Sequence, residues 1–249
     1  MSTSATLNRM VTAVQKQLPK GVRGTLLPIA AVGLALSQVS ASSSGASVII
    51  PPPAIDEPVS GISETIVLAG GCFWGVQGVF QHVEGVTSAV SGYAGGTAES
   101  AHYETVSSGR TGHAEAVQVT FNPRQVSFGQ ILQIYFSVVH DPTELNRQGP
   151  DVGPQYRSAI FAANPSQLEI ARAYLRQLSQ ARVFPQPIVT TADRLAGFYP
   201  AESYHQDFLT LNPHYPYIVI NDLPKIADLK QLFPELYRDT PVLVTKTGT

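Results

Sequence analysis

The sequence contains only one cysteine and one tryptophan, and both lie within residues 70–75. A single cysteine excludes an intramolecular disulfide and any zinc site built from several cysteines. The six histidines form no HExxH motif, so we expect no metal site. With a net charge of −2 and no cluster of basic residues, the chain lacks the positive surface that nucleic-acid binding requires.

Acidic residues are absent from residues 1–55, where basic residues precede an apolar run at 26–36 and a small-x-small tripeptide at 39–41. This layout is typical of a signal peptide, so we expect residues 1–41 to be a signal-like segment that exports the protein to a bacterial periplasm. The apolar run is too short for stable membrane insertion. Organelle targeting, since transit peptides share this composition, and a cytoplasmic location are the alternatives.

The rest of the chain divides by composition into three parts. Residues 42–62 are rich in proline and serine and predict a linker, residues 63–237 predict a catalytic domain, and residues 238–249 predict a loose tail. Strand and helix patterns intermix in the domain without strict βαβ alternation. We therefore expect an α+β fold with two layers, a mixed sheet and helices packed on it.

Apolar periodicity places the elements of the predicted domain. Predicted strands cover 65–69, 86–93, 113–121, 156–161 and 188–191, and predicted helices cover 73–80, 128–139, 165–178, 203–211 and 223–233. Ser127 and Gln130 have the spacing of a capping box, and Asn164 precedes a proline as a helix cap would. Residues 97–111 and 140–155 read as loops, which commonly carry binding residues.

Cys72 lies where the strand at 65–69 turns, through two glycines, into the following helix. The unpaired N–H groups and the positive dipole at a helix N-terminus favour an anion, so we expect the thiol to ionise easily and to act as a nucleophile. A buried, unreactive cysteine is the alternative, because free cysteines are usually small core residues.

Glu115 shares one face of the predicted strand 113–121 with Val117, Val119 and Phe121. A carboxylate on an apolar face is costly unless its pKa rises. A carboxylic acid that stays protonated near neutral pH can serve as a proton donor. A solvated residue at the rim of the strand is the alternative.

The motif GGCFWG at 70–75 closely resembles the active-site signature of the A-type peptide-methionine sulfoxide reductases. Further motifs match that family in the same order: GYAGG at 92–96, TGHAEA at 111–116, HDP at 140–142, QG and QYRS between 148 and 158, and YPAE and HQ between 199 and 206. The resemblance spans about residues 65–237 and implies the family's two-layer α+β fold.

The resemblance implies that this protein reduces methionine-S-sulfoxide, free or in oxidised proteins, and so repairs oxidative damage. Cys72 would attack the sulfoxide sulfur while Glu115 protonates the departing oxygen. Tyr103 and Tyr156 match positions that hydrogen-bond that oxygen, although most tyrosines are packing residues.

Other matched residues imply a seat for the substrate. Phe73 and Trp74 resemble the family's methyl-binding wall, although core packing is the common role of such residues. Asp151 matches a site aspartate that contacts the substrate backbone or supports a catalytic group. We interpret His113 and His140 as structural residues that hold loops by hydrogen bonds.

The chain departs from many family members in lacking a second, resolving cysteine near its C-terminus. The sulfenic acid formed on Cys72 must therefore react with an external thiol, such as a small thiol, glutaredoxin or a thioredoxin-like protein. We expect no prosthetic cofactor, and we expect the protein to be a monomer.

Three other functions remain open from the residues. A cysteine hydrolase or acyltransferase would need a histidine held against Cys72, and no cysteine-protease signature surrounds it. A one-cysteine peroxidase is a chemical variant that the surrounding sequence does not suggest. A non-catalytic module could bind oxidised methionine through Phe73 and Trp74, and sulfoxide-dependent consumption of reductant would distinguish the enzyme from it.

Overall fold

The computed structural model describes residues 48–59 and 61–244, all within one compact unit, Gly45–Thr249. The expected signal-like segment, 1–41, lies outside the described residues, as do 42–47 at the start of the expected linker and 245–249 at the end of the expected tail. Among the described residues no helix has the length and apolarity that a membrane span needs.

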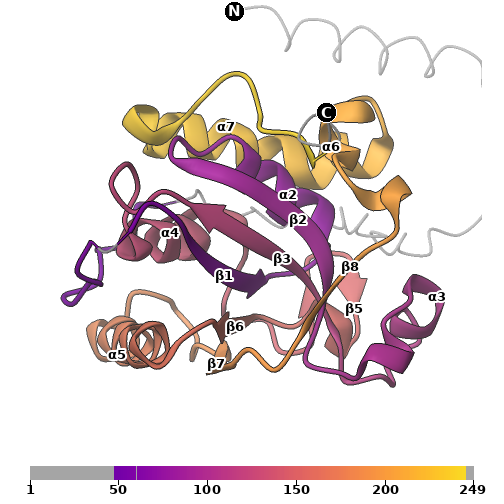
Figure 1. The fold of residues 1–249 in the computed structure, drawn as a ribbon, viewed down its shortest axis with the longest axis horizontal. Helices are drawn as coiled ribbons and strands as arrows, with labels where there is room; N and C mark the ends of the chain where they lie inside the picture. Colours follow the sequence, from indigo (N-terminus) through magenta and orange to yellow (C-terminus); the bar gives the residue numbers. More distant parts are fainter. Residues whose placement is uncertain (1–47, 60, 245–249) are drawn as a thin grey trace, which may run out of the picture. The chain divides into compact units, whose positions relative to one another are not determined.

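A mixed sheet of six strands forms the centre of the described chain, in the order β7-β6-β1-β3-β2-β8 (Figure 1). Neighbouring strands are antiparallel except β6 and β7, which are parallel. The strands are β1 (Glu64–Ala69), β2 (Val86–Ala94), β3 (Ala114–Phe121), β6 (Ala159–Ala162), β7 (Thr191–Arg194) and β8 (Phe198–Pro200). A separate hairpin pairs β4 (Arg147–Gln148) with β5 (Asp151–Val152).

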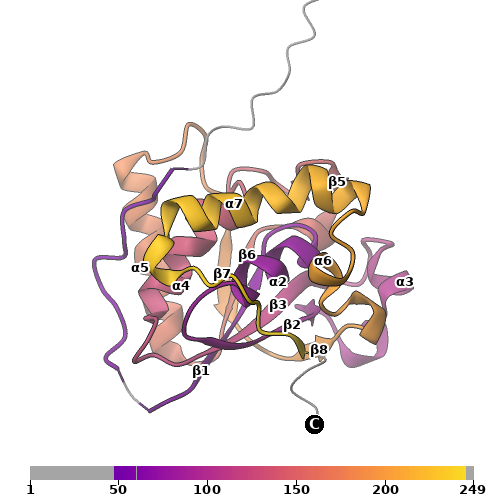
Figure 2. The ribbon, with the colours of Figure 1, turned by 90° about the horizontal axis from the view of Figure 1, so that it is seen from above.

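Helices pack on one face of this sheet, and α7 lies beside α2 in both views (Figures 1 and 2). The helices are α2 (Phe73–Gln81), α3 (Tyr103–Val106), α4 (Phe128–Ile134), α5 (Pro165–Ala181), α6 (Phe208–Leu211) and α7 (Leu223–Leu232). Short 3-10 or π-helical segments are η1 (Ala98–Ser100), η2 (Tyr135–Val139), η3 (Pro154–Tyr156), η4 (Ser203–His205), η5 (Ile218–Asp222) and η6 (Pro234–Leu236).

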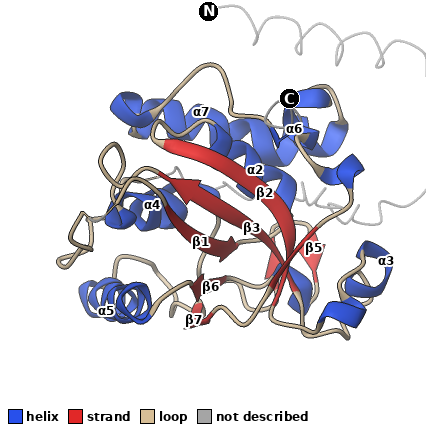
Figure 3. Cartoon of the chain, viewed as in Figure 1, coloured by secondary structure: helices blue, strands red, loops and turns tan. Residues whose placement is uncertain are grey.

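Apolar side chains on the two faces of the sheet form two separate clusters. In β1, Ile66 and Leu68 join the main core with the helices, whereas Val67 and Ala69 join a smaller, alanine-rich cluster. Side chains two apart on a strand share a face, so this division follows from the sequence. The expected two-layer α+β fold with a mixed sheet is confirmed (Figure 3).

Most predicted elements are present, and the exceptions have local causes. The capping box is confirmed, because Ser127 and Gln130 exchange both side-chain-to-backbone hydrogen bonds. Tyr156 is not in a strand: Pro154 begins the helical turn η3, and β6 starts only at Ala159.

Two further expectations are wrong in detail. The helix expected at 203–211 is split into η4 and α6, because Asp207 between them adopts a left-handed conformation with φ 58°. The strand expected at 188–191 begins only at Thr191, and Val189 instead bonds the loop carbonyl of Pro142.

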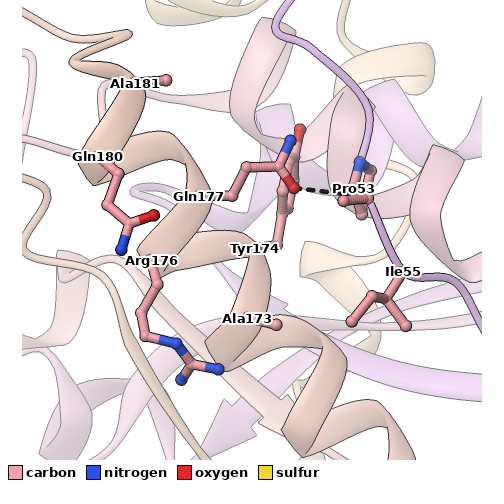
Figure 4. Close-up of a pocket in the computed structure, with 9 residues that line it drawn as sticks. Pro53, Ile55, Ala173, Tyr174, Arg176, Gln177, Gln180 and Ala181 are labelled. Atoms are coloured by element: carbon pink, nitrogen blue, oxygen red, sulfur yellow. Dashed lines mark hydrogen bonds between the residues drawn. The ribbon is translucent and has the colours of Figure 1, made fainter.

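Residues 50–54 of the expected linker form hydrogen bonds with η2 and α5. The N–H of Ile50 donates to Ser137 Oγ over 3.0 Å, and the Tyr174 hydroxyl donates to the carbonyl of Pro51 over 2.6 Å. Gln177 accepts from the N–H of Ala54 over 2.8 Å, at a shallow hollow between residues 53–55 and α5 (Figure 4). We call residues 50–56 the N-terminal strap.

Residues of the expected loose tail also make contacts. The Arg238 guanidinium donates to the carbonyls of Val83 and Val86. The N–H of Val242 donates to the Gln81 carbonyl over 3.0 Å, and Leu243 is buried. The chain through residue 244 is therefore tied to the end of α2.

Candidate active site

Cys72 caps the N-terminus of α2, directly after the turn that leaves β1. Gly71 in this turn has φ 91°, a conformation that favours glycine, and a Cβ there would lie 2.6 Å from Gln148 Cγ. Cys72 itself is half-buried and is the chain's single thiol. The predicted strand–turn–helix setting of Cys72 is confirmed.

The expectation that the thiol ionises easily is wrong. Burial raises the pKa of Cys72 well above its ordinary value, and the negative charges of Glu115 and Asp222 raise it further. The N–H of Trp74, which bonds the sulfur, lowers this pKa but does not outweigh burial. Burial of the sulfur, more than its place at a helix N-terminus, therefore decides that the thiol stays protonated.

Glu115 is 2% exposed on β3 and is not a solvated rim residue. The backbone N–H of Phe73 donates to its Oε2 over 3.1 Å. Burial raises the pKa of Glu115 to about 8, with a further contribution from Asp151, while the hydrogen bond from Phe73 opposes the shift. Glu115 is thus largely protonated at neutral pH, which suits a proton donor and removes its negative charge from the thiol.

Tyr103 and Tyr156 are both half-buried. The charges of Glu115 and Cys72 affect the pKa of each phenol. Burial raises the pKa of each phenol, and the charge of Glu115 raises it further. Both hydroxyls therefore stay neutral donors in the physiological range. Tyr103 begins α3, where its N–H donates to Glu202 Oε1 over 3.0 Å.

Asp151 is part of β5 and accepts a hydrogen bond from the hydroxyl of Tyr217. Its charge also raises the pKa values of Glu115 and Tyr156. The structure therefore brings Asp151 to the same electrostatic cluster as Cys72, as expected. Tyr217 was not identified from the sequence, because it lies in an apolar run outside the matched motifs.

Trp74 lies in a group of aromatic rings. It stacks on Phe208 with centroids 3.8 Å apart, and the rings of Tyr215 and Tyr217 meet it edge-on at 6.1 and 6.0 Å. Its indole Nε1–H donates to Nδ1 of His205 over 3.2 Å. These contacts fix the plane of the indole beside the thiol.

Phe73 is buried and packs on His205 with centroids 5.0 Å apart. The same imidazole lies 4.3 Å from the ring of Tyr103. Burial lowers the pKa of His205, so the ring stays neutral and accepts the indole proton at Nδ1. His205 thus connects three expected site residues, a role that its HQ motif could have suggested.

A buried ion pair lies behind the thiol. The fully buried carboxylate of Asp222 pairs with Nζ of Lys225 over 3.2 Å, while its Oδ2 has no hydrogen-bond partner among the described residues. A Cβ on Gly75 would lie 2.1 Å from Asp222 Oδ1, so only glycine lets this carboxylate reach the first turn of α2. The sequence patterns did not identify this pair.

The remaining motif histidines hold loops, as expected. The N–H of Gly96 donates to Nδ1 of His113, whose Nε2–H donates to the Thr97 carbonyl over 2.9 Å. Both nitrogens of His140 are also engaged, one of them with Ser158 Oγ over 2.6 Å, and burial lowers its pKa to about 3. In the described chain no group of three acidic, histidine or cysteine side chains could hold a metal ion.

The arrangement combines a thiol, a protonated carboxyl group, two neutral phenols and an aromatic wall. Such a site can reduce a polar S–O group whose sulfur carries an apolar substituent. Comparison with known proteins agrees with this chemistry. The chain matches the family "Peptide methionine sulfoxide reductase" over residues 64–236.

Individual relatives are similar over most of the chain. "Peptide methionine sulfoxide reductase MsrA 2" of Mesorhizobium japonicum is 64% identical over 190 residues, 76% of this chain and 97% of that protein. The protein of the same name from Synechocystis is 47% identical over 208 residues, 82% of this chain and 97% of that protein.

Two solved structures have a similar fold. Reduced Mxr1 of Saccharomyces cerevisiae is 32% identical with a TM-score of 0.56, covering 65% of this chain and 91% of that one. Methionine sulfoxide reductase A of Corynebacterium diphtheriae is 32% identical with a TM-score of 0.54, covering 70% of this chain and 92% of that one.

Proposed function

The chain belongs to the peptide methionine sulfoxide reductase family and reduces methionine sulfoxide, and from this premise we propose that it does so with one cysteine and for the S-epimer. Its role is the repair of oxidised proteins. The hydrolase, peroxidase and binding-module alternatives do not account for the protonated carboxyl group of Glu115 beside the thiol.

In the proposed reaction the Cys72 sulfur attacks the sulfoxide sulfur while Glu115 gives its proton to the sulfoxide oxygen. The oxygen then passes to Cys72, two electrons pass to the substrate sulfur, and the thiol proton returns to Glu115. The products are methionine and a Cys72 sulfenic acid. The negative charge of an ionised Glu115 would raise the pKa of the thiol, so attack by Cys72 is favoured while Glu115 still holds its proton.

Three substituents of the substrate sulfur have separate seats in this proposal. The hydroxyls of Tyr103 and Tyr156 donate to the oxygen, and Phe73 with Trp74 encloses the methyl group. Asp151 contacts the substrate backbone or orients these groups. Because the sulfur is a chiral centre with fixed neighbours, only the S-epimer places its oxygen at Glu115.

An external thiol completes the proposed cycle, since the chain has no second cysteine. It attacks the sulfenic acid, which releases water and leaves a mixed disulfide on Cys72. A second thiol then displaces Cys72 and leaves as a disulfide. A thioredoxin-like protein, glutaredoxin or a small thiol can supply these electrons, and the proposed catalytic unit is a monomer.

The observation that carries this proposal is the buried, protonated Glu115 next to the single thiol. The test supplies each epimer of a methionine sulfoxide peptide with dithiothreitol and measures methionine formation. We expect reduction of the S-epimer only, and none by Cys72→Ser, because a hydroxyl is a far weaker nucleophile than a thiol. Equal rates on both epimers would contradict the proposed pocket.

We also propose that residues 1–41 export the enzyme to the periplasm. The acid-free, basic and then apolar sequence supports this proposal. Fractionation of bacteria that express the full chain tests it, with a chain lacking 1–41 as the control. Recovery of both proteins in the cytoplasm would contradict export.

A further inference from the structure

Four large apolar side chains beside the aromatic group are exposed. Leu211 is 59% exposed, Tyr215 47%, Val219 46% and Ile220 70%. We call these four residues the apolar rim. They follow His205 and Phe208 in the chain and surround Tyr217, so they share a segment with residues of the active site.

One residue of the apolar rim, Tyr215, contacts the indole of Trp74. The ring of Tyr215 meets both Trp74 and Phe208 edge-on, at 6.1 and 5.5 Å. The N–H of Val219 donates to the Tyr215 carbonyl over 3.0 Å, which is the spacing of one helical turn. Val219 therefore lies one helical turn after Tyr215, and both side chains are exposed.

The other side of η5 is buried in the core. Ile218 and Asp222 are both buried, whereas Val219 and Ile220 between them are exposed. Apolar side chains are normally exposed singly, and a contiguous exposed group marks an interaction surface. The apolar rim borders the active site, so its residues can contact the parts of a substrate that extend beyond the methionine.

The charge pattern identifies the class of partner. Residues 208–220 contain no Asp, Glu, Lys or Arg, so this segment contributes no charged side chain with which to select a charged partner. Its apolar groups match apolar side chains. Methionine itself is usually buried among apolar neighbours, and its oxidation disrupts such cores.

We propose that the apolar rim binds the apolar residues that flank an oxidised methionine in an extended or unfolded polypeptide. The proposal rests on the proposed function, in which Trp74 holds the methyl group of the same methionine. It makes locally unfolded apolar segments the substrate class, in preference to free methionine sulfoxide or polar surface peptides.

The test uses three substrates with the S-epimer and dithiothreitol: a peptide with leucine and valine on both sides of the sulfoxide, one with serine and glycine there, and a blocked single residue. The measured quantity is the ratio of kcat/KM for the apolar and polar peptides. We expect a ratio of about ten or more, the effect of burying one or two aliphatic side chains.

The variant Leu211→Ser/Val219→Ser/Ile220→Ser should bring this ratio close to one. Its matched control is Val59→Ser/Ile62→Ser, which removes exposed apolar side chains elsewhere and should keep the ratio of the unaltered protein. If the triple variant does not fold, Val219→Ser and Ile220→Ser are tested singly, and each should lower the ratio.

A ratio near one in the unaltered protein would overturn the proposal, as would a ratio unchanged by the rim substitutions. With thioredoxin in place of dithiothreitol, a rim variant that changes only the KM for thioredoxin would also overturn it, because the surface would then bind the reductant. Failure to reduce any of the three substrates would instead contradict the proposed function itself.

Discussion

The backbone N–H of Phe73 donates to the carboxyl group of Glu115 over 3.1 Å, which joins the residue after the nucleophile to the proposed proton donor. Phe73 is the first residue of α2, and Glu115 is the second residue of β3. The bond therefore couples the helix that carries the thiol to the strand that carries the acid. Four predictions concern Glu115, Cys72 and the carboxyl group of Asp222 near the thiol.

Substitution of Glu115 by Gln should lower kcat/KM on the S-epimer by about a hundredfold or more, as expected for loss of a general acid. The amide keeps the shape of the side chain and cannot transfer a proton. Glu104→Gln, an exposed carboxylate next to Tyr103, is the matched control and should retain activity. An E115Q rate close to that of the unaltered enzyme would exclude Glu115 as the acid.

Stability should decrease as pH rises through the range between the two pKa values of Glu115. Its folded pKa is about 8 and its ordinary value is 4.5, so in this range the folded state holds a proton that the unfolded chain has lost. Each pH unit then removes up to about 1.4 kcal/mol from the free energy of unfolding. Below the ordinary value both states are protonated and this contribution is fully present.

The pH prediction is checked by denaturant unfolding at about pH 5 and about pH 8. Other groups titrate in the same range, so the comparison is between the unaltered protein and E115Q. The E115Q protein should lose less stability over the interval. Parallel curves for the two proteins would show that Glu115 titrates at its ordinary pKa.

Asp222→Asn should lower the pKa of the Cys72 thiol, because the carboxylate of Asp222 raises it in the folded protein. The rate of alkylation by iodoacetamide against pH measures this pKa, and its midpoint should move to lower pH. Asp193→Asn removes an exposed carboxylate and should leave the midpoint in place. A midpoint that rises in D222N would contradict the assigned sign.

Without reductant, the enzyme should form one methionine per chain and stop. The single cysteine allows one oxidation to the sulfenic acid, which dimedone should label at Cys72. Mass spectrometry of the treated protein checks the label, and prolonged exposure should convert the unlabelled sulfenic acid to sulfinic acid. A yield above one methionine per chain with no added thiol would contradict the one-cysteine cycle.

Local sequence patterns predicted the parts of this structure that depend on local interactions. The turn at Cys72, the burial of Glu115 and the capping box at Ser127 follow from residues a few positions apart. The split in the helix at 203–211 did not, because a single left-handed residue, Asp207, decides it.

The missed site residues depend on contacts between distant parts of the chain. Tyr217 reaches Asp151, and Asp222 packs against Gly75, with no periodicity that relates either pair. The pKa of Cys72 was misjudged for the same reason. The helix dipole can be read from neighbouring residues, but the burial of the thiol depends on the folded structure, and the carboxyl groups that add to it come from β3 and η5.

The N-terminal strap sets a limit on how this enzyme can be shortened. Truncation at residue 63, where sequence composition places the start of the domain, would leave Ser137, Tyr174 and Gln177 without their backbone partners. It would also remove the Asp56 carboxylate that accepts from the N–H of Gly129 in the first turn of α4. A recombinant enzyme or fusion protein should therefore keep residues from 48 onward, with any tag or tether attached before the strap.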